Sequence, residues 1–234
     1  MRRSASDPTA RLPASRSRQN YLKALLQTGS GAAVPVSVLA RTLRVSAPSV
    51  TNMLAHLSEE QLVELGPRGA ARLTAAGERA AALVLRRHRL LETFLTRVLE
   101  MDWSEVHEDA EELEHHVSER LIDALDRYME HPSEDPHGHP IPDRHGRLAR
   151  RALSPLAALP AGARARVREV RGGADRARLT RWKRSGLVPG ARVRMLESHP
   201  EDGVFTLEIG GRRMVSGREG LEGVMIERRT RAKP

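Results

Sequence analysis

The sequence contains no cysteine, which excludes disulfide bonds, thiolate catalysis and sulfur-ligated metal sites. Aromatic residues are scarce, with two each of Trp, Tyr and Phe among 234 residues, so Leu, Val and Ala must build the cores. No run approaches the roughly 18 apolar residues of a membrane span, and the N-terminal residues lack the apolar segment of a secretory signal. We therefore expect a soluble, cytoplasmic and mainly helical protein of one to three domains.

The net charge of +9 is distributed unevenly along the chain. Residues 1–75 carry ten Lys and Arg against four Asp and Glu, residues 76–145 carry eight against 17, and residues 146–234 carry 21 against nine. The net charges of the three segments are therefore +6, −9 and +12. This segregation favours polyanion binding by the ends and cation binding by the middle. The alternative is an Arg- and Ala-rich composition without functional meaning.

The first third of the chain has the pattern of a DNA-binding domain. Residues 1–16 lack periodicity, which predicts a disordered basic arm, and an apolar stripe from Tyr21 predicts a first helix. A short helix starting near Pro35 and a second helix capped by Ser46 form a helix-turn-helix. A β-hairpin over residues 63–74 follows as a wing.

The second helix of this motif has one apolar face, so its opposite face is available to the major groove. Small side chains there allow close approach, and Asn52 can pair with adenine. The residues predicted to face DNA bases are Ser46, Ala47, Pro48, Ser49, Thr51 and Asn52. Those predicted to contact phosphates are Arg41, Arg44, Arg68 and Arg72. A protein-docking role for the same motif is the alternative.

The acidic middle is predicted to contain two long helices, one over residues 75–99 and one from Ser104, its N-cap, to about residue 130. Four donors recur on one face of the second helix, namely His107, Glu111, Glu114 and His115. The first helix adds His88 and Glu92, one turn apart, and can complete one or two coordination shells. Imidazole and carboxylate donors without sulfur suit manganese, ferrous iron, zinc or cobalt, and the carboxylates favour the harder ions. A solvated acidic helix face is the alternative.

The last third of the chain predicts a small β domain. Residues 131–146, HPSEDPHGHPIPDRHG, exclude helix because they contain four prolines and two glycines. We interpret their PHGHPIP segment as a rigid connector rather than a histidine metal tract. From about Ala163, short alternating strands with a turn at Gly210-Gly211 predict an antiparallel barrel.

Taken together, these motifs resemble the diphtheria toxin repressor and manganese transport regulator family of metal-dependent transcription factors. The strongest similarity lies in RRHRLLE (residues 86–92) and VHEDAEELEHH (residues 106–116), and the resemblance spans about residues 17–230. It implies a mainly α fold with a small β domain. The implied domains are a winged helix-turn-helix over residues 17–78, a helical metal-binding and dimerisation domain over 79–150, and an SH3-like (FeoA-like) domain over 160–230.

The resemblance also implies metal ligands. One site of the family uses a Cys or Glu, then Glu and His, and these positions fall on Glu111, Glu114 and His115. A Glu in the first position resembles the manganese-responsive branch, since thiolate favours ferrous iron. The first helix of the family supplies another ligand, which falls on Asn20, and where the manganese branch has a further Glu this chain has Lys23.

His88, Glu92 and His107 match the second site of the family, and Asp175 is the candidate for a carboxylate from the C-terminal domain. The implied function is a homodimeric regulator, in the first place a repressor, of manganese or iron homeostasis genes. Its corepressor would be Mn²⁺, or else Fe²⁺, and its target a palindromic operator in double-stranded DNA. No membrane or small-molecule substrate is expected as a partner.

Two other classes of function compete with this one. The Glu-x-x-His from Glu112 to His115 is typical of di-metal carboxylate proteins, but these need two such motifs, and the other match contains Pro136. No zinc-protease, Gly-x-Ser-x-Gly or Walker motif is present, so we expect no enzyme. A metal-independent basic DNA-binding or architectural protein would bind DNA in a salt-dependent way and ignore chelators.

Overall fold

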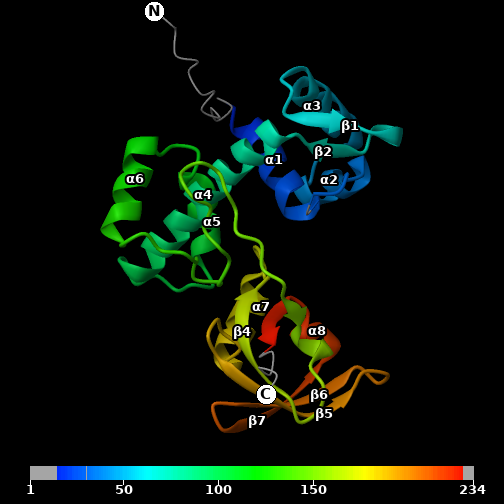
Figure 1. Cartoon of the computed structure of the whole chain (residues 1–234), viewed down its shortest axis with the longest axis vertical. Helices are drawn as coiled ribbons and strands as arrows, with labels where there is room; N and C mark the ends of the chain where they lie inside the picture. The colour runs from blue at the N-terminus through cyan, green and yellow to red at the C-terminus, as the bar shows by residue number, and fades with distance from the viewer. Residues whose placement is uncertain (1–14, 30, 229–234) are drawn as a thin grey trace, which may run out of the picture. The chain divides into compact units, whose positions relative to one another are not determined.

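The computed structural model describes residues 15–29 and 31–228 (Figure 1). Their contacts divide the chain into two units. The first unit consists of the chain up to His88 with Glu114–Val117 and Ile141–Ala149, and the second of Arg89–Leu113, Ser118–Pro140 and the chain from Arg150. The basic arm predicted for residues 1–16 lies, except for its last two residues, outside the described part.

The first unit contains a winged helix, as predicted. Its elements are α1 (Arg16–Gly29), α2 (Val36–Leu43), α3 (Ala47–Glu59), β1 (Val63–Leu65), the 3-10 turn η1 (Pro67–Gly69) and β2 (Ala71–Leu73). β1 and β2 pair antiparallel and form the wing. α1 begins before Tyr21, where the apolar stripe starts, because polar residues continue the helix towards the N-terminus.

The turn between α2 and α3 has the expected local chemistry. α2 ends at Leu43, and its C-cap residue Arg44 takes a left-handed conformation with φ 55°. Ser46 caps α3, and its hydroxyl accepts a hydrogen bond of 3.3 Å from the backbone N–H of Ser49. Val50 and Leu54 of α3 are buried in the core of the winged helix, so the opposite face of α3 is left to solvent.

The long helix predicted from residue 75 is α4 (Ala75–Arg97). The prediction of one helix from Ser104 to about residue 130 is wrong, because two helices occupy this range, α5 (Val106–Leu113) and α6 (Glu119–Tyr128). No helix among residues 15–29 and 31–228 is both long enough and apolar enough to cross a membrane.

The break between α5 and α6 lies at Glu114. Its backbone carbonyl accepts a hydrogen bond of 3.3 Å from the side chain of Arg87, and its carboxylate is fully buried. Glu114 therefore has partners that differ from those of a residue inside a continuous, solvent-facing helix. Ser118 then caps α6 by accepting from the N–H of Leu121. Ser104 is engaged with Asp102. Since α5 ends at Leu113, Glu114 and His115 do not share a helical face with His107 and Glu111, contrary to the prediction.

The second unit contains a six-stranded antiparallel sheet in the order β3-β8-β4-β5-β6-β7. The strands are β3 (Ser154–Pro155), β4 (Arg164–Val170), β5 (Arg192–His199), β6 (Val204–Ile209), β7 (Arg212–Gly217) and β8 (Val224–Arg228). The turn between β6 and β7 is the predicted one, with φ 55° at Gly210 and 79° at Gly211. The predicted strands began at about Ala163, so the sequence prediction did not include β3, the 3-10 turn η2 (Leu156–Ala158) or the helices α7 (Arg176–Ser185) and α8 (Arg218–Leu221).

The sheet and α7 share one hydrophobic core with Trp103, which precedes α5 in the chain. Ion pairs flank this contact: Lys183 of α7 lies 2.7 Å from Asp102, and Arg176 pairs with Glu105. Asp102 also accepts hydrogen bonds from the backbone N–H and the hydroxyl of Ser104. Within the second unit, the segment before α5 is therefore fixed to the β domain.

We expect Asp102→Asn to destabilise the second unit by about 1 kcal/mol at neutral pH, a modest loss because the pair is partly exposed. Hydrogen bonds from Lys183 and Ser104 lower the pKa of Asp102 from 3.8 to about 2. The carboxylate therefore stabilises the fold above pH 3.8, and this contribution is lost as the pH falls towards 2.

Urea denaturation at a series of pH values measures this difference between the variant and the wild type. Glu201→Gln, at an exposed carboxylate in the turn between β5 and β6, is the matched control. The stabilising role assigned to the Asp102 carboxylate would be contradicted if the stability difference between Asp102→Asn and the wild type stayed constant down to the lowest pH.

Candidate metal centre and DNA-binding face

The middle of α4 buries an unusual number of charged side chains. Six polar or charged residues there are at most 9% exposed, namely Arg86, Arg87, His88, Arg89, Glu92 and Thr93. Charged residues are seldom buried this far unless they are paired. Two of the arginines hold the PHGHPIP segment, since Arg86 donates to the carbonyl of Pro142 and Arg89 to that of Pro140.

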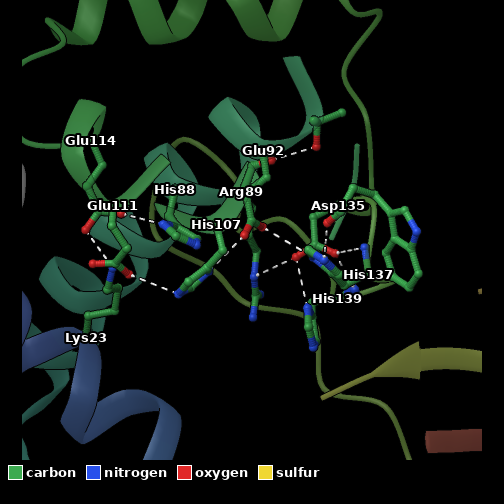
Figure 2. A network of polar contacts seen from close by, with 12 residues as sticks. Lys23, His88, Arg89, Glu92, His107, Glu111, Glu114, Asp135, His137 and His139 are labelled. Carbon is green, nitrogen blue, oxygen red and sulfur yellow. Dashed lines mark hydrogen bonds and ion pairs between the residues drawn. The ribbon is translucent and has the colours of Figure 1, made fainter. Parts of the chain in front are cut away.

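In the first unit, the buried carboxylate of Glu114 contacts two cationic or polar partners (Figure 2). Its Oε1 lies 2.6 Å from Nζ of Lys23, and its Oε2 lies 2.8 Å from Nδ1 of His88. Lys23 itself is only 5% exposed. Both oxygens of Glu114 thus have a protein partner.

The neighbouring residue His115 is attached to α1. Its Nδ1 lies 2.9 Å from Oε1 of Gln19, which is buried. Next to Gln19, the buried Oδ1 of Asn20 accepts no hydrogen bond within the described residues. An oxygen of this kind can serve a cation, so the first unit holds a possible neutral ligand where the sequence predicts one.

In the second unit, the carboxylate of Glu92 is the centre of a second cluster, visible in Figure 2. Its Oε1 lies 3.1 Å from Nδ1 of His107, and its Oε2 lies 3.7 Å from Nδ1 of His137. Nε2 of His107 lies 3.8 Å from Oε1 of Glu111. His88 precedes Glu92 by one turn of the same helix, α4.

This donor set fits a divalent cation. It is made of imidazole nitrogens and carboxylate oxygens, and Glu92 is 3% exposed, so water competes little for its charge. Burial acts to lower the pKa of His137, but the carboxylates of Glu92 and Asp135 outweigh it and raise that pKa above its usual range. The negative charge of Glu92 thus favours positive charge in its surroundings, which is what a bound cation would supply.

Asp135 and two histidines of the PHGHPIP segment form a third group of potential ligands, which was not among the predicted metal ligands. Asp135, His137 and His139 each offer a ligand atom, and these atoms lie within 4.8 Å of one another. Asp135 is 5% exposed, and its Oδ1 accepts from the backbone N–H groups of His137 and His139. Burial acts to raise the pKa of Asp135, but His139 and Arg89 outweigh it and lower that pKa.

A signal for this group exists in the sequence. The spacing Asp-x-His-x-His puts three metal-ligating side chains within five residues, and Pro136 between them and Pro140 after them restrict the backbone. The segment is also fixed to β4, where the N–H of Val170 donates to the carbonyl of His137. The proline-rich segment thus does more than end the helices, because its restricted backbone also positions the side chains of Asp135, His137 and His139.

The remaining predicted ligand, Asp175, caps α7. Its Oδ1 accepts a hydrogen bond of 2.9 Å from the N–H of Arg178, and its Oδ2 lies 3.5 Å from Nε of the same residue. The side chain is exposed. Its observed partners therefore account for it as a helix cap.

The predicted DNA-binding residues lie on the surface of the winged helix. The six residues on α3 and at its cap, from Ser46 to Asn52 apart from the buried Val50, are all exposed. The four arginines Arg41, Arg44, Arg68 and Arg72 are exposed as well. Arg72 pairs with Glu64 across the wing at 2.6 Å, so part of its charge is already compensated.

Three family models match successive parts of the chain. A model of the N-terminal DNA-binding domain of iron-dependent repressors matches residues 14–71. A model of the metal-binding and dimerisation domain of the same repressors matches residues 74–143, and the FeoA domain matches residues 154–228.

Individual relatives agree with these models. The iron-dependent repressor IdeR of Mycobacterium tuberculosis is 29% identical over 226 residues, which cover 89% of this chain and 95% of IdeR. A structure described as a manganese-dependent transcriptional repressor in complex with manganese is 34% identical, with a TM-score of 0.83, and covers 90% of this chain and 99% of its own. The structure of ScaR with bound Cd²⁺ is 28% identical, with a TM-score of 0.79, over 90% of this chain and 99% of its own.

We expect Gly138→Ala to destabilise the second unit by at least about 2 kcal/mol. Gly138 has φ +84°, and an added Cβ would lie 2.0 Å from the backbone oxygen of Arg168, so the segment would have to leave β4. Gly162→Ala is the control, because Gly162 has φ +79° but nothing within 4 Å of an added Cβ. Urea denaturation of both variants separates the clash from the backbone strain, and equal losses would contradict the tight packing of Gly138.

Proposed function

Because the chain belongs to the iron-dependent repressor family of metal-dependent transcriptional regulators, we propose that a divalent metal ion controls its binding to an operator in double-stranded DNA. The function is regulatory and not enzymatic. The observation that carries the proposal is the buried carboxylate of Glu92 among imidazoles, in a chain that also exposes a winged helix with a small-residue face. Acting on DNA, the protein would work in the cytoplasm.

The proposed metal ligands are Glu92 and His107, with His88 one turn away on α4 and Glu111 one turn away on α5. We propose Mn²⁺ as the preferred ion, since the donors are nitrogen and oxygen only, with Fe²⁺ as the second choice. When bound, the ion would supply positive charge next to the buried carboxylate of Glu92. The second predicted set, Glu111, Glu114 and His115 with Asn20, stays a prediction.

The protein's own residues would carry the effect of the ion. Without it, Glu92 is held by His107 and His137, and the negative charges of α5 repel one another. Neutralising Glu92 and Glu111 would favour the arrangement of the chain in which two recognition helices meet DNA. The ion would then act as a corepressor, because it would bind more tightly to the arrangement that binds DNA than to the arrangement that does not.

The DNA-binding residues of the proposal are those of the exposed α3 face and the four arginines. Asn52 is placed to read an adenine and the residues from Ser46 to Ser49 to approach the base edges. Arg41, Arg44 and Arg68 would contact phosphates. The regulated genes would be those of manganese or iron homeostasis.

The proposal includes a homodimer that binds a palindromic operator. α6 buries only Ile122, while Leu121 and Tyr128 are 45% and 70% exposed. Apolar side chains exposed in this way are typical of an interface, and the matched family model describes dimerisation for this range. Two-fold symmetry would pair two winged helices with two half-sites.

We expect Glu92→Gln to weaken Mn²⁺ binding at least about tenfold, because the amide keeps the shape of the carboxylate but loses its charge. Isothermal titration of the full chain with MnCl₂ measures the effect. Glu108→Gln, an exposed acid on α5, is the matched control and should match the wild type. Unchanged binding in Glu92→Gln would refute the proposed site.

We expect binding to a duplex selected from a random pool with Mn²⁺ present to be at least about tenfold tighter with Mn²⁺ than with chelator. Asn52→Ala should weaken binding to that duplex about tenfold and leave binding to an unrelated duplex unchanged, because one base contact is lost. Fluorescence anisotropy measures both. Equal affinity with Mn²⁺ and with chelator would favour the metal-independent basic protein instead.

A further inference from the structure

Lys23 is a buried lysine in the middle of α1. It is 5% exposed, which is rare for an ammonium group and requires a compensating partner. That partner is Glu114, which follows Lys23 by 91 positions in the sequence and is 0% exposed. The distance of 2.6 Å between Nζ and Oε1 makes this a charge-assisted hydrogen bond.

The surroundings of Glu114 leave no carboxylate oxygen without a partner. Oε1 faces Lys23 and Oε2 faces Nδ1 of His88, while the guanidinium of Arg87 lies at the backbone oxygen of the same residue. A divalent cation bound to Glu114 would have to displace the ammonium group or sit beside it. Repulsion between two cations at this depth is poorly screened and opposes that arrangement.

We infer that Lys23 is a built-in cation that occupies the place of a metal ion at Glu114. The Lys23–Glu114 pair ties α1 to the segment Glu114–Val117 by the chain's own charges, so this link needs no metal. The inference deepens the proposed function: metal control is left to the cluster around Glu92.

The link reaches the DNA-binding residues through the core of the winged helix. Leu22 and Leu25, which flank Lys23 on α1, pack in the same cluster as Leu39 of α2 and Val50 of α3. α1 is thus part of the body that carries the recognition helix. Because the Lys23–Glu114 pair needs no metal, α1 and the winged helix stay linked to the segment Glu114–Val117 with or without an ion.

Asn20 is the residue whose surroundings favour a metal ion at Glu114 instead of Lys23. Asn20 lies one turn before Lys23, and its buried Oδ1 accepts no hydrogen bond among the described residues. If a metal ion displaced Lys23 from Glu114, Asn20 and His115 would be the residues to join it. Metal bound by Asn20 and Glu114 is therefore the alternative to test.

The first experiment measures thermal unfolding of the full chain in chelator. We expect Lys23→Met to lower the midpoint by about 5 °C or more, since it leaves a buried carboxylate without its partner. The double variant Lys23→Met/Glu114→Gln should recover at least half of that loss, because it removes both charges. Lys183→Met, at an exposed ion pair of α7, is the control, and it should lose less because its partner Asp102 stays partly in contact with water. No loss in Lys23→Met, or no recovery in the double variant, would overturn the inference.

The second experiment counts Mn²⁺ ions per subunit by elemental analysis after gel filtration. We expect Glu114→Gln and Asn20→Ala each to bind as many ions as the wild type. A count lower by one in either variant would overturn the inference. Failure of the proposed function is distinguishable, because it would appear as a wild type that binds no Mn²⁺, while the unfolding experiment is independent of metal.

Discussion

The burial of carboxylates among helices is the constraint on which this structure depends. Glu92, Glu114 and Asp135 are at most 5% exposed, and a negative charge at that depth is very costly unless positive charge or hydrogen bonds surround it. Each has a different solution. Glu114 has Lys23 and His88, Asp135 has backbone N–H groups with His139 and Arg89, and Glu92 has two imidazoles. The imidazole and carboxylate donors around Glu92 are ligands that a divalent cation accepts, which is why we place the metal ion there.

These charge arrangements also organise the surrounding chain. Arg86 and Arg89 donate to the carbonyls of Pro142 and Pro140, so they fix the proline-rich segment beside the acidic clusters. In the second unit, the ring of Trp103 lies 5.1 Å from that of His137 and also enters the core of the β domain. A change in the partners of Glu92 therefore acts on His137, and through it on side chains packed with the sheet. Trp103 and His137 thus link the cluster around Glu92 to the core of the β domain.

Periodicity and turn chemistry were enough to predict the winged helix, α4 and the strands, because local preference and burial agree there. They failed where a contact with a residue far away in the sequence determines the local structure. A continuous helix through Glu114 satisfies every local rule, and only the burial of its carboxylate against Lys23, from a distant part of the chain, accounts for the break. α7 was missed since its many arginines hide the apolar pair Leu179 and Trp182, which are buried. Lys23 was visible in the sequence as a departure from the pattern of the family, but the sequence did not show that Glu114 is its partner.

The most direct test of how the cations are distributed is a crystal structure of the full chain grown with Mn²⁺, with anomalous differences recorded above the manganese absorption edge. The account predicts an anomalous peak bonded to Glu92 and His107, and a Lys23 ammonium still at Glu114 with no peak there. A peak bonded to Glu114, with Lys23 turned away, would contradict the account. So would the absence of any peak beside Glu92.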